Sequence, residues 1–138
     1  MIDIRSMKRA VIPWLTVLAL TAAARVNAHH SFAATYLEGQ SVTIEGDLVT
    51  FELRNPHSFV NVMVKDPSGQ MVRYLVEWGS TTQLQGKISR ETLKAGDHII
   101  ITGNPARNAD DHRVRLVTLR RPKDGWSWGL AADEVITR

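Results

Sequence analysis

The stretch SFVNVMVKDPSGQMVRYLVEW, residues 58–78, decides the fold of this chain. Every second residue from Val60 to Val64 is valine, and residues 71–78 alternate in the same way, which is the period of a β-strand with one buried face. The residues between, Asp66 to Gly69, make a strong turn, because proline presets φ at the second turn position and glycine suits the fourth. The stretch therefore predicts a β-hairpin.

Three further segments have the pattern of strands. The longest is Ser41–Leu53, in which the apolar phase shifts at Leu48 close to Gly46, and this predicts a bulge or a sharp bend. The other two strands are expected at His98–Thr102 and Arg113–Leu119.

Helical character is confined to the segment between the third and fourth strands. It predicts two short pieces, Thr81–Gln85 and Arg90–Lys94, the second with Ser89 as N-cap and Gly96 as its C-terminal stop. A polar loop is expected at 108–112, before the last strand.

The order of three strands, a helical segment and two strands, with a long bent first strand, is that of the OB-fold, a five-stranded Greek-key barrel. We therefore expect an all-β, small OB-like barrel; a β-sandwich is the alternative, but it would need about seven strands. Strand alternation predicts a core that includes Val60, Val62, Val64, Val76, Ile99, Ile101, Val114 and Leu116.

Residues 1–28 have the three parts of a secretory signal peptide: a basic start, an apolar stretch over 10–24 and small residues at Val26 and Ala28. The apolar stretch is shorter than the roughly 20 residues that span a bilayer, and Pro13 interrupts it, so a retained anchor is the weaker interpretation. We expect cleavage before His29. The mature protein would be one periplasmic domain, 29–138, with a tail from about 120 and no stable membrane span.

Charge and cysteine content narrow the possible partners. The chain has 17 Lys+Arg against 14 Asp+Glu, but four of the basic residues and one acidic residue lie in the expected signal peptide. The mature chain would therefore be balanced, without the basic excess that nucleic-acid binding favours, and we expect no nucleic-acid partner. The absence of cysteine excludes disulfides, thiolate metal sites and thiol catalysis.

Several motifs together resemble a family of small exported bacterial proteins of unknown function. The motifs are His29-His30-Ser31-Phe32, Asn55-Pro56-His57, Glu77 with Gly79-Ser80, and Leu93-Lys94-Ala95-Gly96-Asp97. The resemblance covers the chain from His29 to about Leu119, and it implies a secreted β-rich domain without supplying an activity. The sequence departs from the family pattern after Ser80, where a proline is expected, and this affects the start of the helix.

Metal binding is the chemistry that the histidines favour. A mature terminus at His29 would offer its α-amine and Nδ1 as a chelate, and one more imidazole would complete a histidine brace, a nitrogen set that favours Cu(II). Both groups can be neutral near pH 7, since their ordinary pKa values are about 7.7–8.0 and 6.5. His57, at the turn after Pro56, is the expected third ligand, with His30 as the backup. Two histidines at a terminus can equally be a frayed polar end.

A second candidate site is a ligand groove with Trp126, Trp128 and Glu77. The two tryptophans would share one side of an extended segment, either packed over a barrel end or forming a stacking platform for a flat ligand. Glu77 would be a partner of an imidazole or form an ion pair with Arg73 or Arg54. His98 and His112 are expected to be solvated.

The sequence lacks the nucleophile-elbow, phosphate-loop and zinc-protease motifs, so we expect a binding protein and not an enzyme. The leading hypothesis is a periplasmic protein that binds copper through the brace. The alternative is a barrel that binds a protein or small ligand in its groove without metal. A third class, a haem-handling or other assembly factor, rests on analogy with the fold alone.

Overall fold

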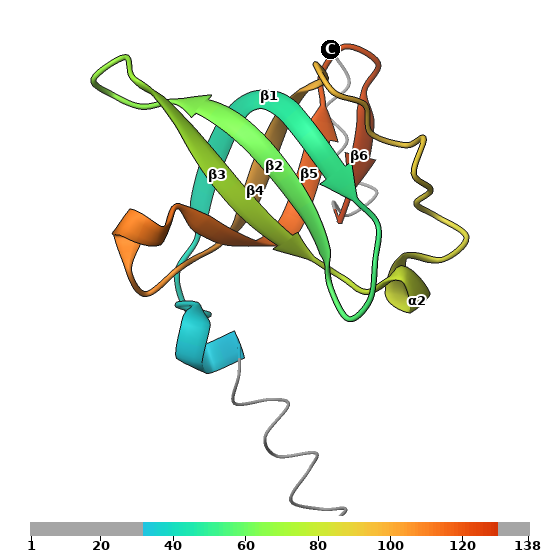
Figure 1. Ribbon diagram of the computed structural model, residues 1–138, viewed down its shortest axis with the longest axis horizontal. Helices are drawn as coiled ribbons and strands as arrows, with labels where there is room; N and C mark the ends of the chain where they lie inside the picture. Colours follow the sequence, from blue (N-terminus) through green and yellow to red (C-terminus); the bar gives the residue numbers. More distant parts are fainter. Residues whose placement is uncertain (1–31, 130–138) are drawn as a thin grey trace, which may run out of the picture. The chain divides into compact units, whose positions relative to one another are not determined.

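The structure is a computed structural model that describes residues 32–129. The elements of the unit that begins at Tyr36 are short and mostly strands (Figure 1). In chain order they are β1 (Val42–Glu52), β2 (Ser58–Lys65), β3 (Met71–Trp78), α2 (Thr81–Leu84), β4 (His98–Pro105), η1 (Ala109–Asp111), β5 (Arg113–Arg121) and β6 (Trp126–Trp128). The predicted all-β class with a short helix between β3 and β4 is therefore confirmed.

β1 is bent so that it pairs with two different strands. Its first half is antiparallel to β4 and its second half is antiparallel to β2, and the register with β2 shifts between Leu48 and Thr50. Gly46 lies where the two pairings overlap, and a Cβ added there would be 2.1 Å from the carbonyl oxygen of Met63. The predicted bend beside Gly46 is thus confirmed, and the close backbone approach explains why the position is glycine.

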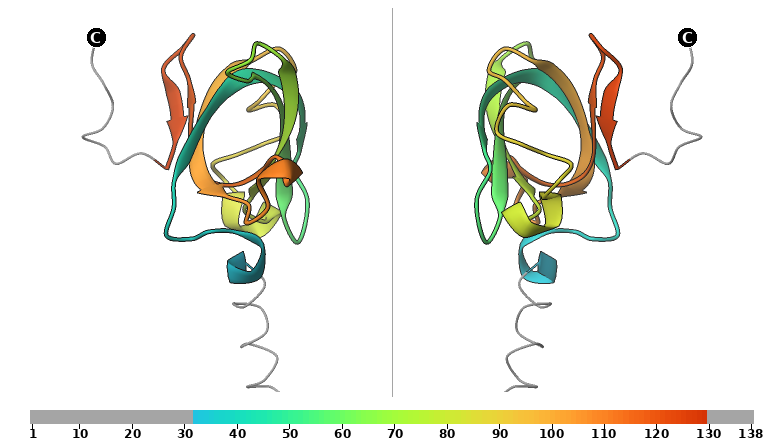
Figure 2. Two further views of the ribbon diagram at one scale, coloured as in Figure 1. Left: turned by 90° about the vertical axis from the view of Figure 1, so that its left-hand side faces the viewer. Right: turned by 90° about the vertical axis from the view of Figure 1, so that its right-hand side faces the viewer.

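The sheet closes into a barrel through a parallel pairing of β3 with β5. Leu75, Val76 and Glu77 are in register with Arg113, Val114 and Arg115. The ring order is then β1-β2-β3-β5-β4, and the strands curve around it in Figure 2. This closed five-stranded barrel is the predicted OB-like architecture.

All eight residues predicted for the core are buried. The interior is completed by Trp78 of β3, by Leu84 of α2 and by Ile88 and Leu93 from the segment that follows α2. Side chains of this segment therefore cover the barrel interior, although the segment is not helical after Leu84.

The helical prediction was right for one piece and wrong for the other. Thr81–Leu84 is a helix with a capping box between Ser80 and Gln83. Residues 90–94 form turns and bends. The Ser89 cap bonds to the Glu91 amide at 3.3 Å, but the Thr92 carbonyl accepts from Arg121 Nη1 at 2.6 Å and not from a following helical turn. A tertiary contact thus replaces helical bonding there.

The segment from Arg120, expected as a tail, begins within a strand. β5 continues to Arg121, and β6 pairs antiparallel with residues 119–121. The polar loop at 108–112 contains the 3-10 turn η1.

No helix within residues 32–129 is long and apolar enough to cross a bilayer. The predicted signal peptide, residues 1–28, lies outside the described part of the chain.

Candidate functional site

His57 immediately precedes β2 and lies beside Glu77 of β3. The register places Phe59 opposite Glu77, so the residue two positions before Phe59 is on the same face as that carboxylate. His57 Nδ1 is 3.4 Å from Glu77 Oε1. The His57 side chain is 33% exposed and the Glu77 side chain 11%, so the histidine has access to solvent while its carboxylate partner is largely buried.

The loop before His57 is fixed by hydrogen bonds to the segment after β3. The Thr81 amide donates to Asn55 Oδ1 at 3.1 Å, and the Ser58 amide donates to the Gly79 carbonyl at 3.0 Å. The Asn55–Pro56 peptide is cis. These bonds connect the Asn-Pro-His motif to the Gly-Ser motif, two of the motifs that the sequence singled out.

The Glu77 carboxylate accepts hydrogen bonds from two side chains that the sequence did not indicate. The Tyr36 hydroxyl donates to Oε2 at 2.5 Å, and Arg113 Nη2 donates to the same oxygen at 3.2 Å. The expected ion-pair partners of Glu77, Arg73 and Arg54, were therefore wrong. Arg113 takes that position because the β3–β5 pairing brings it to the side of Glu77.

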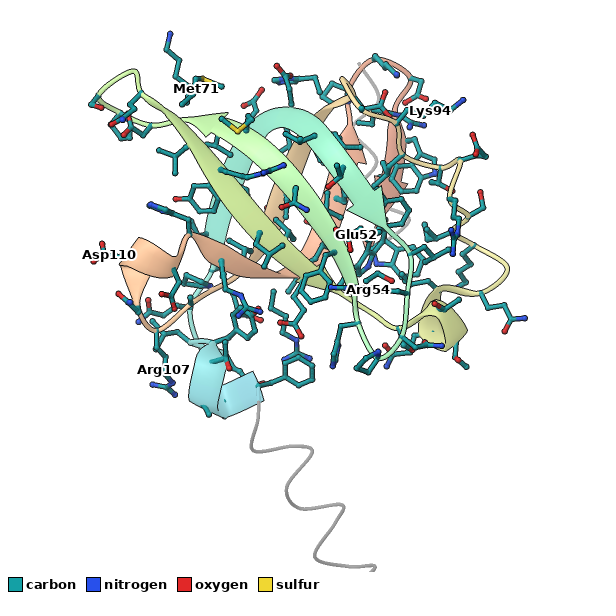
Figure 3. The ribbon with its side chains drawn as sticks, viewed as in Figure 1. Glu52, Arg54, Met71, Lys94, Arg107 and Asp110 are labelled. Atoms are coloured by element: carbon teal, nitrogen blue, oxygen red, sulfur yellow. The ribbon has the colours of Figure 1, made fainter. Side chains whose placement is uncertain are left out.

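Arg54 has other neighbours. Its Nε lies 3.6 Å from Glu52 Oε2, and Figure 3 shows the two side chains together near the end of β1. Its guanidinium also lies over the Phe59 ring, 4.7 Å from the centroid. Arg54 therefore covers the outer surface of β1 and β2.

Tyr36 is a neutral hydrogen-bond donor throughout the physiological range. Burial raises the pKa of its phenol, and the hydrogen bond to Glu77 and the charge of Glu77 raise it further, outweighing Arg113. The residue is only 1% exposed. Its neighbour Leu37 donates its amide to the Pro105 carbonyl at 2.9 Å, which ties this segment to the end of β4.

The other predicted ligands cannot be compared with this geometry. His29 and His30 lie outside the described residues. Within residues 32–129, no three histidine, aspartate or glutamate side chains gather into a set that could hold a metal ion. Among the described residues, His57 and Glu77 therefore do not by themselves form such a set.

The two tryptophans of the predicted groove pack against the core. Trp128 meets Trp78 edge to face with centroids 5.4 Å apart, and the Arg121 guanidinium lies 5.3 Å from the Trp126 ring centroid. Both tryptophans are partly buried. Consecutive strand residues project to opposite faces, so Glu77 and Trp78 face different sides of β3. Trp128 lies on the side of Trp78.

Two charged clusters were missed by the sequence prediction. His98, expected to be solvated, is exposed but places Nε2 2.8 Å from Glu45 and Nδ1 2.8 Å from Asp47. The hydrogen bond to Glu45 and then that to Asp47 raise the pKa of His98. The sequence contained part of the signal for this cluster, because Glu45 and Asp47 are two residues apart and so share one face of a strand. The pairing of β1 with β4 then places Asp47 in register with His98.

The second missed cluster surrounds buried Asp97, which bonds Arg121 and Lys123. His112, also expected to be solvated, packs its ring 5.2 Å from that of Tyr74. Arg121 of the Asp97 cluster is also the residue whose guanidinium lies over Trp126 of the proposed groove.

Comparison with known proteins gives a family without a function. A family model described as a family of unknown function (DUF6152) matches residues 17–115. No curated protein matches the sequence. Among solved structures, the mitochondrial single-stranded DNA-binding protein Rim1 of S. cerevisiae is similar with 13% identity and a TM-score of 0.44, over 59% of this chain and 92% of that one.

Proposed function

Because the chain belongs to the DUF6152 family of unknown function, we propose a role from its own side chains. The protein is exported to the periplasm and binds one Cu(II) ion through a processed amino terminus at His29 and the imidazole of His57. His30 is the alternative ligand. The protein binds copper without catalysing a reaction, and it acts as a carrier or a sensor of the ion.

One observation carries this proposal: Tyr36 and His57 contact the same carboxylate, Glu77. His29 precedes Tyr36 by seven residues. A chain of that length spans at most about 25 Å when fully extended. A tether of this length is compatible with a processed amino terminus that reaches His57, as a brace built from both residues requires.

The surroundings of His57 suit a metal ligand. Histidines that bind metals almost always direct their second nitrogen to a carboxylate, a backbone carbonyl or water, and Glu77 lies at Nδ1 of His57. A set of one amine and two imidazoles is a nitrogen site, at which Cu(II) binds more tightly than Zn(II).

The metal-free alternative, a groove that binds a protein or small ligand, depends on Trp126 and Trp128. Their contacts with Trp78 and Arg121 account for both rings as packing over the barrel. We therefore rank it second.

The proposal is tested by copper titration with electron paramagnetic resonance on protein purified from the periplasm. Intact mass should place His29 first. The processed protein should bind one Cu(II), and its affinity should fall as pH drops through about 6 to 7, because each ligand must lose its proton. One residue added ahead of His29, or His57→Ala, should each weaken binding. His98→Ala is the matched control, since it removes an imidazole that lies between two carboxylates of β1, away from His57.

Two results would contradict the proposal. One is a mature chain that begins elsewhere. The other is an extended protein and a His57→Ala protein that both bind as tightly as the processed wild type with the same spectrum. The groove with Trp126 and Trp128 would then be the better hypothesis.

A further inference from the structure

The two oxygens of Glu77 have different partners. Oε2 accepts from the Tyr36 hydroxyl at 2.5 Å and from Arg113 Nη2 at 3.2 Å. Oε1 is the oxygen that faces His57, at 3.4 Å from Nδ1. Since Oε2 is already bonded to two donors, the carboxylate is fixed in one orientation with Oε1 directed at the imidazole.

An ionised carboxylate can only accept hydrogen bonds, so it favours the imidazole form that has its proton on the facing nitrogen. For His57 the facing nitrogen is Nδ1. In that tautomer the lone pair of the neutral ring is on Nε2. Orientation by a carboxylate also fixes the plane of the ring.

We propose that Glu77 is a positioning residue that holds neutral His57 in the Nδ1–H tautomer and so selects Nε2 as the coordinating atom. The selection of Nε2 as the ligand atom rests on the proposed copper role. The tautomer itself is a property of the metal-free protein. Tyr36 and Arg113 act through Glu77 by fixing its orientation.

The tautomer is measured first, without metal. Long-range proton–nitrogen-15 correlation spectra at mildly alkaline pH distinguish the two neutral forms of each histidine. Wild-type His57 should give the Nδ1–H pattern, and Glu77→Gln should lose that preference because an amide can also donate. Glu45→Gln is the matched control, since it makes the same change at the carboxylate beside His98. A wild-type His57 in the Nε2–H form overturns the inference, even if the variant fails to fold.

Copper affinity gives the second measurement, arranged as a double-mutant cycle. Loss of a group that orients a metal-binding histidine typically lowers metal affinity by about 10- to 100-fold. Glu77→Gln should have that effect in the wild-type background and none in the His57→Ala background, because it acts through His57. Glu45→Gln should leave the affinity unchanged.

The cycle separates two kinds of failure. An equal loss in both backgrounds overturns the positioning role of Glu77 while copper binding stands. A processed wild type that binds no copper overturns the proposed function, and the nuclear magnetic resonance result then decides the tautomer by itself.

Discussion

Asp97 is a carboxylate that the fold keeps ionised inside the protein. It is 4% exposed and accepts from Lys123 Nζ, from Arg121 Nη1 at 3.0 Å and from the Lys94 amide at 3.0 Å. Burial alone would raise the pKa of Asp97. The hydrogen bonds from Lys123, the Lys94 amide and Arg121 outweigh burial and lower it to about 2.

A group whose pKa is lower in the folded state stabilises the fold above its unfolded pKa, and that stability is lost as pH falls toward the folded pKa. We expect Asp97→Asn to reduce the free energy of unfolding by about 2 kcal/mol at neutral pH. The difference from wild type should shrink between about pH 4 and pH 2, where the wild-type carboxyl becomes protonated. Urea unfolding of both proteins across this pH range measures the difference in the free energy of unfolding.

Asp110→Asn is the control, because this aspartate lies exposed on η1 (Figure 3). A loss for Asp97→Asn that is the same at pH 2 as at pH 7 would show that the carboxylate charge contributes nothing.

The sequence could indicate single residues of the candidate site but not their buried partners. Glu77 was considered as a partner of an imidazole because it is a carboxylate within a strand, and the structure places it beside His57. Tyr36 and Arg113 were missed because each reaches Glu77 through pairings between segments distant in sequence, namely the bridge from Tyr36 to Ala106 and the β3–β5 pairing. Periodicity reports which face a residue occupies and not which distant strand lies beside it.

At the scale of elements, the bend of β1 depends on Gly46. A Cβ at this position would meet the backbone of Met63, which belongs to the neighbouring strand and cannot move aside as a side chain does. We expect Gly46→Ala to destabilise the protein by about 3 kcal/mol or more, since overpacking of backbone is costly. Thermal unfolding followed by circular dichroism measures it.

Gly39→Ala is the matched control, because a Cβ added at Gly39 has no atom within 4 Å among its described neighbours. If both variants melt at the wild-type temperature, the close approach in β1 does not constrain the fold.

The five barrel strands were predictable because each has one buried face, which gives a two-residue period. β6 was not, because its three residues are all partly buried and show no such period. The second helical piece, residues 90–94, was not, because its decisive contact is the bond from Arg121 to the Thr92 carbonyl. A cap signal such as Ser89 specifies a possible helix start, and tertiary contacts decide whether the helix continues.

At the scale of the whole molecule, one hydrophobic interior serves all five barrel strands. Val62 is fully buried in that interior. We expect Val62→Asp to abolish the folded state, because it leaves an unpaired charge in the core. Tryptophan fluorescence and circular dichroism should report an unfolded chain.

Asn61→Asp places a carboxylate at the adjacent position, on the outer face, where Asn61 bonds Thr50 Oγ1 at 2.9 Å. This variant should fold. A folded Val62→Asp protein with an unchanged melting temperature would mean that the face assignment of β2 is inverted.

The pairing of β3 with β5 also has a consequence for how the chain folds. The β2–β3 hairpin is local and can form in about 1–10 μs. The parallel pairing joins two strands separated by α2 and β4, so it must await a long loop closure, and topologies of this kind fold in about milliseconds to seconds. Arg113 reaches Glu77 only through that pairing. We therefore expect the Arg113–Glu77 bond to form after the β2–β3 hairpin, so that the orientation of the carboxylate beside His57 depends on closure of the whole barrel.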